Sequence, residues 1–108
     1  MDVQLKRGML DVCVLCALLK EDSYGYKIIK DLSPFVQISE STLYPILRRL
    51  ETAGNLSVYS AEHNGRLRKY YKITDDGVAK VREFLTEWKS MMDIYEFIEE
   101  EMRNHDKD

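Results

Sequence analysis

The spacing of apolar residues changes twice along this chain, and the change around Asn64-Gly65 is the strongest constraint on its fold. Before that point apolar residues recur every three or four positions, as they do on helices. Beside it they alternate with polar residues, and Asn-Gly between two β-rich runs predicts a hairpin with a tight turn. After Thr74 the helical spacing returns and continues to Met102. The sequence therefore predicts a mainly α fold with a two-stranded β-hairpin.

Three helices are predicted before the hairpin, and each has a start or stop signal. We expect them at residues 5–20, 24–32 and 39–53. The first is apolar almost all the way round, so it should be buried on several sides. Ser23 is the expected N-cap of the second, and Ser33-Pro34 stops it, because proline disfavours a helical conformation at the preceding residue. Ser39 or Ser41 is expected to cap the third, which Gly54 ends.

Thr74 is the expected N-cap of the last predicted helix. This helix has more apolar surface than one small domain can cover. Two apolar registers run along it at helical spacing and meet at Trp88 and Tyr95. Such a wide face needs a partner helix, most simply its own copy in a two-fold homodimer. The element order predicts a winged helix-turn-helix at residues 1–74, followed by a C-terminal dimerisation helix at 75–108.

The charge of the chain is unevenly distributed. The formal net charge is −3, but residues 41–74 carry six basic and two acidic side chains, a net of +4. Residues 75–108 carry five basic and eleven acidic side chains, a net of −6. A weakly acidic total therefore does not exclude a polyanionic partner. It indicates that such a partner would bind the third helix and hairpin, with the acidic tail facing away.

The third helix separates into an apolar and a polar face. Leucine and isoleucine at 43, 46, 47 and 50 should face the core. The outward set combines arginines with hydroxyl and aromatic groups, which reach phosphates and base edges in a DNA major groove. An ordinary solvated helix face is the alternative interpretation. The candidate DNA-contacting residues here are Ser41, Thr42, Tyr44, Pro45, Arg48 and Arg49.

The second hairpin strand is basic, and no acidic residue occurs between Glu62 and Asp75. Arginine and lysine at 66, 68, 69 and 72 are interleaved with Tyr70 and Tyr71, which gives a surface suited to follow a phosphate backbone. Part of this strand, Tyr71 and Ile73, should instead cover the core. The candidate DNA-contacting residues of the hairpin are Arg66, Arg68, Lys69 and Tyr70.

Several stretches together resemble the PadR family of bacterial transcriptional regulators. The most specific are Thr42-Leu43-Tyr44-Pro45 and Arg68-Lys69-Tyr70-Tyr71; Leu5-Lys6-Arg7-Gly8 and Gly25-Tyr26 agree as well. The similarity covers about residues 5–90, and the short tail resembles the subgroup with a single C-terminal helix. The resemblance implies a dimeric winged-helix repressor that small hydrophobic or phenolic compounds release from its double-stranded DNA operator.

The single tryptophan is a candidate ligand contact. Two copies of Trp88 across a two-fold axis would present facing indoles, which suit a flat aromatic effector. Leu85 and Met92 lie one turn either side, and the first helix around Cys13 is a candidate second wall. The alternative is that Trp88 only anchors a hydrophobic core.

Other features do not indicate catalysis or a cofactor. Cys13 and Cys16 form a CxxC inside an apolar helix, where two small core side chains are expected rather than half a metal site. No nucleophile–base pair, phosphate loop or metal-ligand cluster is present in the sequence, so we expect no enzyme, cofactor or metal. The longest apolar stretch is too short to span a bilayer, and a cytoplasmic protein is expected. The alternative function is a winged helix that binds proteins without binding DNA.

Overall fold

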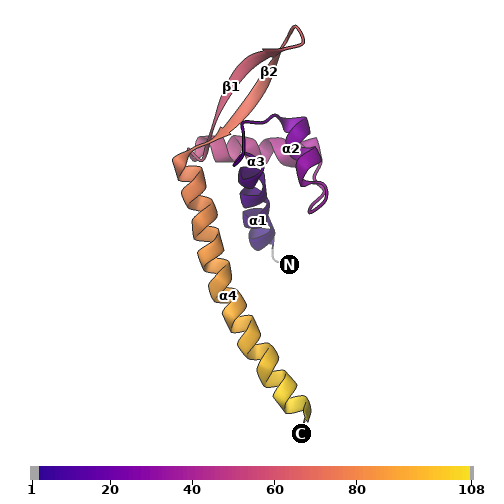
Figure 1. Cartoon of the computed structure of the whole chain (residues 1–108), viewed down its shortest axis with the longest axis vertical. Coiled ribbons are helices and arrows are strands. Elements are labelled where there is room, and N and C mark those ends of the chain that lie inside the picture. Colours follow the sequence, from indigo (N-terminus) through magenta and orange to yellow (C-terminus); the bar gives the residue numbers. More distant parts are fainter. Residues whose placement is uncertain (1–2, 108) are drawn as a thin grey trace.

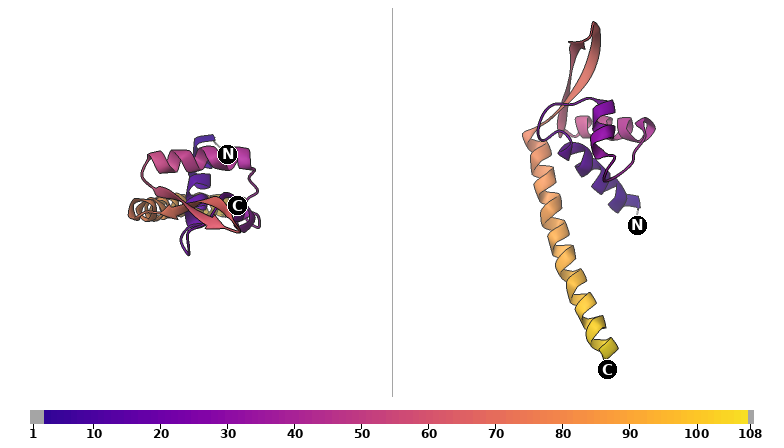
Figure 2. Two further views of the ribbon diagram at one scale, coloured as in Figure 1. Left: turned by 90° about the horizontal axis from the view of Figure 1, so that it is seen from above. Right: turned by 45° about the vertical axis from the view of Figure 1, so that its right-hand side comes forward.

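The computed structural model describes residues 3–107, and its elements follow the predicted order. The bounds are α1 Val3–Cys16, α2 Gly25–Leu32, α3 Glu40–Thr52, β1 Leu56–His63, β2 Arg66–Ile73 and α4 Asp75–Lys107. The hairpin and α4 extend from the helical body in opposite directions (Figure 1), and the turned views of Figure 2 show the same arrangement. The molecule measures 70 × 25 × 23 Å. The mainly α, winged-helix prediction is confirmed.

Side chains from all three short helices meet in one apolar core. The base of the hairpin and the start of α4 close it. Each fully buried leucine contributes roughly 1.5–3 kcal/mol from apolar burial, so this set dominates the stability of the body. The core consists of Val12, Val14, Leu15, Leu18, Ile28, Leu32, Leu43, Ile46, Leu47, Leu50, Leu56, Tyr71 and Val81.

The first helix is shorter than predicted. It ends at Cys16, and the amides of Leu18 and Leu19 bond three residues back, to Leu15 and Cys16, as the chain turns. Apolar spacing through Leu19 suggested a longer helix, but the chain must reverse here to reach the hairpin. Cys16 is exposed and Cys13 half-buried, so the prediction of two core cysteines is wrong for Cys16.

Ser23 is not the N-cap of α2. The N-cap is Tyr24, and its side chain makes no capping hydrogen bond. Ser23 instead pairs with β2 in an isolated bridge, in which its amide donates to the Tyr71 carbonyl (3.1 Å) and the Tyr71 amide donates to the Ser23 carbonyl (2.7 Å). The loop before α2 therefore adds one bridge to the base of the hairpin, a long-range pairing that local sequence does not reveal.

The junction between the hairpin and α4 is tightly tied to α3. Thr74 caps α4 as predicted, accepting a hydrogen bond from the Gly77 amide (3.1 Å) while its hydroxyl donates to the Gly54 carbonyl (2.7 Å). A Cβ on Gly77 would clash with the Asn55 carbonyl oxygen, so only glycine allows this approach. The start of α4 is therefore fixed to the body. The predicted division into a DNA-binding domain at residues 1–74 and a dimerisation helix at 75–108 stays a prediction.

Within residues 3–107, no helix combines the length and apolar character needed to cross a membrane.

Candidate nucleic-acid interface

The exposed face of α3 carries polar and basic side chains, as predicted. Leu43, Ile46, Leu47 and Leu50 are buried, which fixes the helix to the core along one side. All six candidate contacts on this helix lie on its exposed part: Ser41, Thr42, Tyr44, Pro45, Arg48 and Arg49. This places two guanidinium groups and three hydroxyls on a single helix that the core holds rigidly.

The beginning of α3 presents a group of hydroxyls to solvent. Ser39 is the N-cap, but its hydroxyl lies 2.8 Å from that of Ser41 and 3.3 Å from that of Thr42 and makes no capping bond to the backbone. Pro45 sits inside the helix, and the helix continues through it to Thr52. These hydroxyls remain free to exchange partners with an incoming phosphate or base edge.

The two arginines of α3 have different surroundings. Arg49 donates from Nη2 to the carboxylate of Asp11, a nearly buried side chain in the middle of α1. Among residues 3–107, Arg48 makes no ion pair. Asp11 is the one charge within an otherwise apolar run of α1, and that isolation was the available sequence signal for a partner. Arg49 is thus anchored between helices, whereas Arg48 projects freely.

The hairpin has the geometry of a wing. Asn64 and Gly65 have φ of 52° and 79°, the left-handed values that a two-residue turn of this kind requires. The strands pair antiparallel from Leu56 with Ile73 to His63 with Arg66. Lys69 and Arg66 are exposed, while Arg68 and Tyr70 are half-buried. Tyr71, which was expected to cover the core, is buried against it, and Ile73 is half-buried.

A cluster of aromatic side chains joins the base of the wing to the loop before α2. The Arg68 guanidinium lies 3.8 Å from the centroid of the Tyr24 ring, a cation–π contact. Tyr70 packs edge-on against Tyr24 (5.9 Å) and stacks on Tyr59 (5.6 Å). Tyr59 in turn donates to Asp22 (2.6 Å), and this hydrogen bond raises the pKa of Tyr59. Arg68 and Tyr70, predicted as DNA contacts, therefore also hold the wing in place.

A groove of about 500 Å³ lies between the wing and the exposed face of α3. Gly25, the first residue of α2, allows Tyr44 of α3 to approach α2 closely, because a Cβ there would lie 2.5 Å from the Tyr44 hydroxyl oxygen. The lining of the groove combines aromatic rings with two cations: Tyr24, Gly25, Tyr26, Tyr44, Arg68, Lys69 and Tyr71. Two predicted elements, α3 and the wing, thus meet at one basic, aromatic surface. Tyr24 and Tyr26 belong to it but were not predicted.

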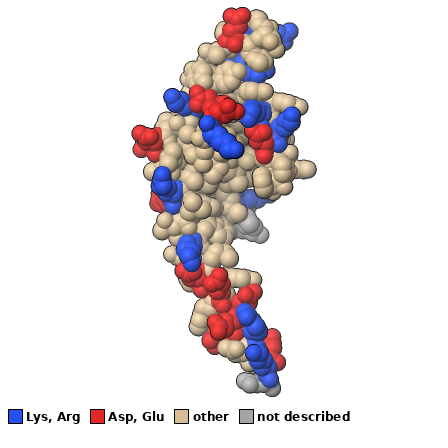
Figure 3. Space-filling model, in the orientation of Figure 1, with Lys and Arg blue, Asp and Glu red and all other residues tan. Residues whose placement is uncertain are grey.

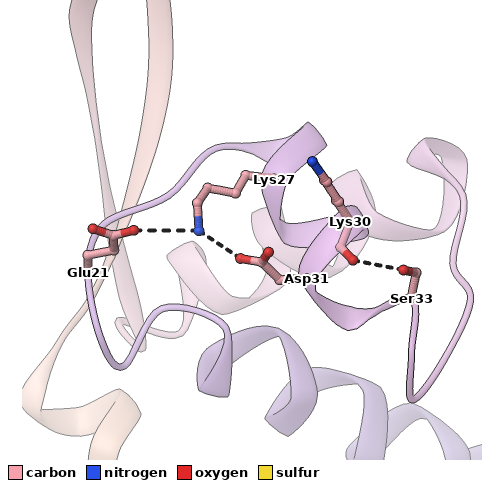
Figure 4. A network of polar contacts seen from close by, with 5 residues as sticks. All are labelled: Glu21, Lys27, Lys30, Asp31 and Ser33. Atoms are coloured by element: carbon pink, nitrogen blue, oxygen red, sulfur yellow. Dashed lines mark hydrogen bonds and ion pairs between the residues drawn. The ribbon is translucent and has the colours of Figure 1, made fainter.

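Acidic side chains gather elsewhere, on the far half of α4 (Figure 3). The face of the body visible in that view carries both signs of charge. Lys27 lies 2.8 Å from Asp31 and 3.5 Å from Glu21 (Figure 4). The hydrogen bond to Asp31 is the main cause of the raised pKa of Lys27.

The same ion pairs border an apolar groove of about 690 Å³ between α1, α2 and the start of α4. Cys13 and Phe84 line it, together with Phe35, whose side chain is 87% exposed. Leu85, Trp88 and Met92 do not line this groove within one chain; they lie further along α4, where Trp88 packs on Phe84 with ring centroids 5.7 Å apart. That Cys13, Leu85, Trp88 and Met92 contact the same ligand therefore stays a prediction.

The part of α4 beyond Phe84 leaves its apolar side chains uncovered. They are 45–62% exposed: Leu85, Met91, Met92, Ile94, Tyr95, Phe97, Ile98 and Met102. An exposed apolar face of this size marks an interaction surface.

Comparison with known proteins shows the same architecture in regulators of several bacteria. Residues 14–83 match the model of the transcriptional regulator PadR-like family. An uncharacterized protein of Lysinibacillus sphaericus is 36% identical over 99 residues, which cover 87% of this chain and 91% of the relative. A PadR-like transcription factor from Bacteroides fragilis is 36% identical with a TM-score of 0.78, covering 88% of this chain and 94% of its own. A PadR family transcriptional regulator from Eggerthella lenta is 38% identical with a TM-score of 0.74, covering 84% and 81%.

Proposed function

This chain belongs to the transcriptional regulator PadR-like family, and from that membership we propose that it is a dimeric repressor released from its operator by a small hydrophobic or aromatic compound. The family consists of DNA-binding transcriptional regulators and not of enzymes. The observation that carries the DNA-binding part of this proposal is the meeting of the basic wing with the exposed face of α3 at one surface.

In DNA binding, α3 and the wing are expected to have different roles. We expect α3 to enter the major groove, where the free Arg48 can bind a guanine edge or a phosphate. Lys69, exposed on the wing, is expected to contact the phosphate backbone. The wing cluster around Tyr24 would hold Lys69 and its neighbours at a fixed angle to α3. We expect the remaining predicted contacts on α3 and the wing to contribute to the same interface with DNA: Ser41, Thr42, Tyr44, Pro45, Arg49, Arg66, Arg68 and Tyr70.

The dimer is proposed from α4. In solution its uncovered apolar side chains would pack against a second copy, whose α4 supplies the same surface under two-fold symmetry. The two α3 helices would then occupy half-sites about one or two helical turns apart on a pseudo-palindrome. Binding both half-sites in one event raises affinity well above that of a single half-site.

The effector site is proposed at the two-fold axis. Trp88 from each copy would stack on a flat guest, with Leu85 and Met92 beside it and Cys13 on the facing α1. A guest changes DNA affinity only if it prefers one arrangement of the two wings over the other. Because Trp88 is the single tryptophan, its fluorescence reports on this site directly. Planar cationic dyes and phenolic acids should quench it at tens of micromolar and weaken operator binding; quenching without an effect on DNA would contradict an effector role.

The DNA-binding proposal is tested on the duplex upstream of the chain's own coding sequence. The protein should bind it with an affinity that falls steeply as salt rises, since phosphate contacts release counterions. A double Arg48→Ala, Lys69→Ala variant should lose most of this binding. Unchanged affinity in that variant would contradict the assigned surface, and a flat salt response would favour a protein-binding module instead.

A further inference from the structure

The exposed face of α3 is bordered by a groove on each side, and basic side chains line part of both grooves. The groove toward the wing holds Arg68 and Lys69. A second groove of about 280 Å³ lies on the other flank, between α3 and the beginning of α1. Its polar lining is Lys6, Arg7, Ser41, Thr42 and Arg49. This second groove is formed partly by α1, an element to which the sequence assigned no DNA contact.

The helical positions place these grooves on opposite flanks. At about 100° per residue, Ser41, Arg48 and Thr52 mark the middle of the exposed face of α3. Thr42 and Arg49 lie to one side of that line and contribute to the groove with α1. Tyr44 lies to the other side and contributes to the groove with the wing. A surface that receives the exposed face of α3 therefore meets both grooves.

The groove with α1 is held in place by an ion pair and carries cations on its edge. The ion pair between Arg49 and Asp11 ties α3 to α1 and offsets one positive charge. Lys6 and Arg7 remain as two exposed cations on its edge, and Ser41 and Thr42 supply hydroxyls from the opposite wall. Glu40, the acidic residue in the first turn of α3, is not among the lining residues. Two cations facing two hydroxyl donors form a site suited to a phosphate group.

The phosphates that border the major groove of DNA are the ligand that fits this site. The major groove of B-DNA is roughly 12 Å wide, about the diameter of a helix with its side chains, and a phosphate backbone borders each side of it. We propose that Lys6 and Arg7, at the start of α1, bind phosphates on the side of the major groove opposite the side that the wing contacts. This inference rests on the proposed DNA-binding function and adds α1 as a third contacting element.

The test compares two double variants of the full-length protein. Lys6→Ala with Arg7→Ala removes one lysine and one arginine from the groove. Arg103→Ala with Lys107→Ala removes the same charges from the far end of α4 and serves as the matched control. The groove variant should fold normally, since cations near a helix N-terminus oppose the helix dipole and alanine favours helix. Circular dichroism melting checks this.

We expect the groove variant to bind operator and unrelated duplexes at least tenfold more weakly near 0.1 M salt. Its plot of log affinity against log salt should be flatter by about two units for each bound chain, and so by about four for the proposed dimer, because each phosphate that the protein no longer neutralises lowers the slope by close to one unit. The control variant should stay within about twofold of the unaltered protein, because its charges lie far from the duplex. An equal loss in both variants would overturn the inference, since it would indicate only a change in overall charge.

Ethylation interference on the operator locates the contacts. The groove variant should lose interference at phosphates of one strand, and Lys69→Ala should lose it at phosphates of the other strand beside the same half-site. If Arg48→Ala with Lys69→Ala abolishes binding while the groove variant retains the full salt slope, the inference about α1 is wrong and the proposed function stands. If the unaltered protein binds no duplex, the proposed function itself is wrong, and the inference with it.

Discussion

The beginning and the far part of α4 have the same apolar spacing but opposite surroundings. At the beginning, Val81 is buried and Phe84 packs against the core beside α1. Further along, Leu85, Tyr95 and Met102 are all more than half exposed, although they continue the same pattern. Nothing in the local sequence distinguishes the two parts. Apolar periodicity therefore shows that a face needs to be covered, while the tertiary structure decides whether the same chain covers it.

This difference separates two kinds of stability in the molecule. The body gains its stability within one chain, from a core shared by α1, α2, α3, β1, β2 and the start of α4. The far part of α4 is a long single helix, and isolated helices are marginal in water without tertiary packing. Under the proposed function its order depends on a second copy, so its stability should vary with protein concentration.

The largest expected effect comes from a charge on the uncovered face of α4. Tyr95 lies in both apolar registers, and Tyr95→Glu should place a carboxylate inside the proposed helix–helix contact. We expect a monomer by light scattering and a loss of operator affinity of about 10² or more, because the two half-sites would no longer share one binding event.

The matched control is Thr86→Glu. Thr86 is exposed and lies nine residues before Tyr95, half a helical rotation away on the opposite side. This variant should remain dimeric. A dimer that survives Tyr95→Glu would remove the contrast between the two parts of α4 and would place the interface elsewhere, most simply on α1.

Smaller effects are expected from single side chains of the DNA-binding surface. Arg48→Ala should cost about 1–3 kcal/mol in operator binding and relax the sequence preference, if the arginine contacts a base. Lys69→Ala should weaken all duplexes alike and flatten the salt slope by about one unit for each bound chain. Both are measured by fluorescence anisotropy over a range of salt. Sequence-independent loss in Arg48→Ala would instead assign Arg48 to a phosphate.

The support of the wing should give a weaker but distinct effect. Tyr24→Ala removes the ring beneath Arg68 and beside Tyr70, contacts worth roughly 0.5–1.5 kcal/mol each. We expect faster amide exchange in β2 and operator affinity lower by several-fold. Tyr24→Phe keeps the ring and should restore both. Equal effects of the two variants would mean that the hydroxyl, and not the ring, matters.

The smallest effect concerns the cysteines of α1. Partial burial raises the pKa of the half-buried Cys13 thiol. Cys16 is more exposed, and partial desolvation together with the charge of the neighbouring Cys13 raises the pKa of its thiol as well. The neutral thiols therefore favour the folded state below their unfolded pKa, and this contribution is lost as pH rises through the folded values. At pH 8 the folded chain should react with iodoacetamide more slowly than the unfolded chain, as mass spectrometry would measure. Equal rates would mean that the body does not shield this part of α1.

The features that the sequence predicted are those set by local patterns. The hairpin turn follows from Asn64-Gly65, the cap of α4 from Thr74, and the buried face of α3 from its spacing of leucine and isoleucine. In each case the residues that form the feature lie within a few positions of one another, so single-chain patterns are sufficient.

The features that the sequence did not predict are contacts between segments far apart in the chain. Ser23 pairs with Tyr71, and Asp11 holds Arg49, across 48 and 38 positions of sequence. Tyr24 supports the wing although it lies before α2. Pairing of this kind depends on how the elements pack, and residue spacing carries no information about it. Only the isolated charge of Asp11 in an apolar helix gave a signal.

The central claim is that two copies, joined through α4, place two α3 helices on one stretch of DNA. Sedimentation of the protein with the duplex upstream of its coding sequence tests this directly. The account predicts a complex that holds two chains per duplex, formed without a detectable one-chain species at micromolar protein. A saturated complex with one chain per duplex, or no complex near 0.1 M salt, would contradict it.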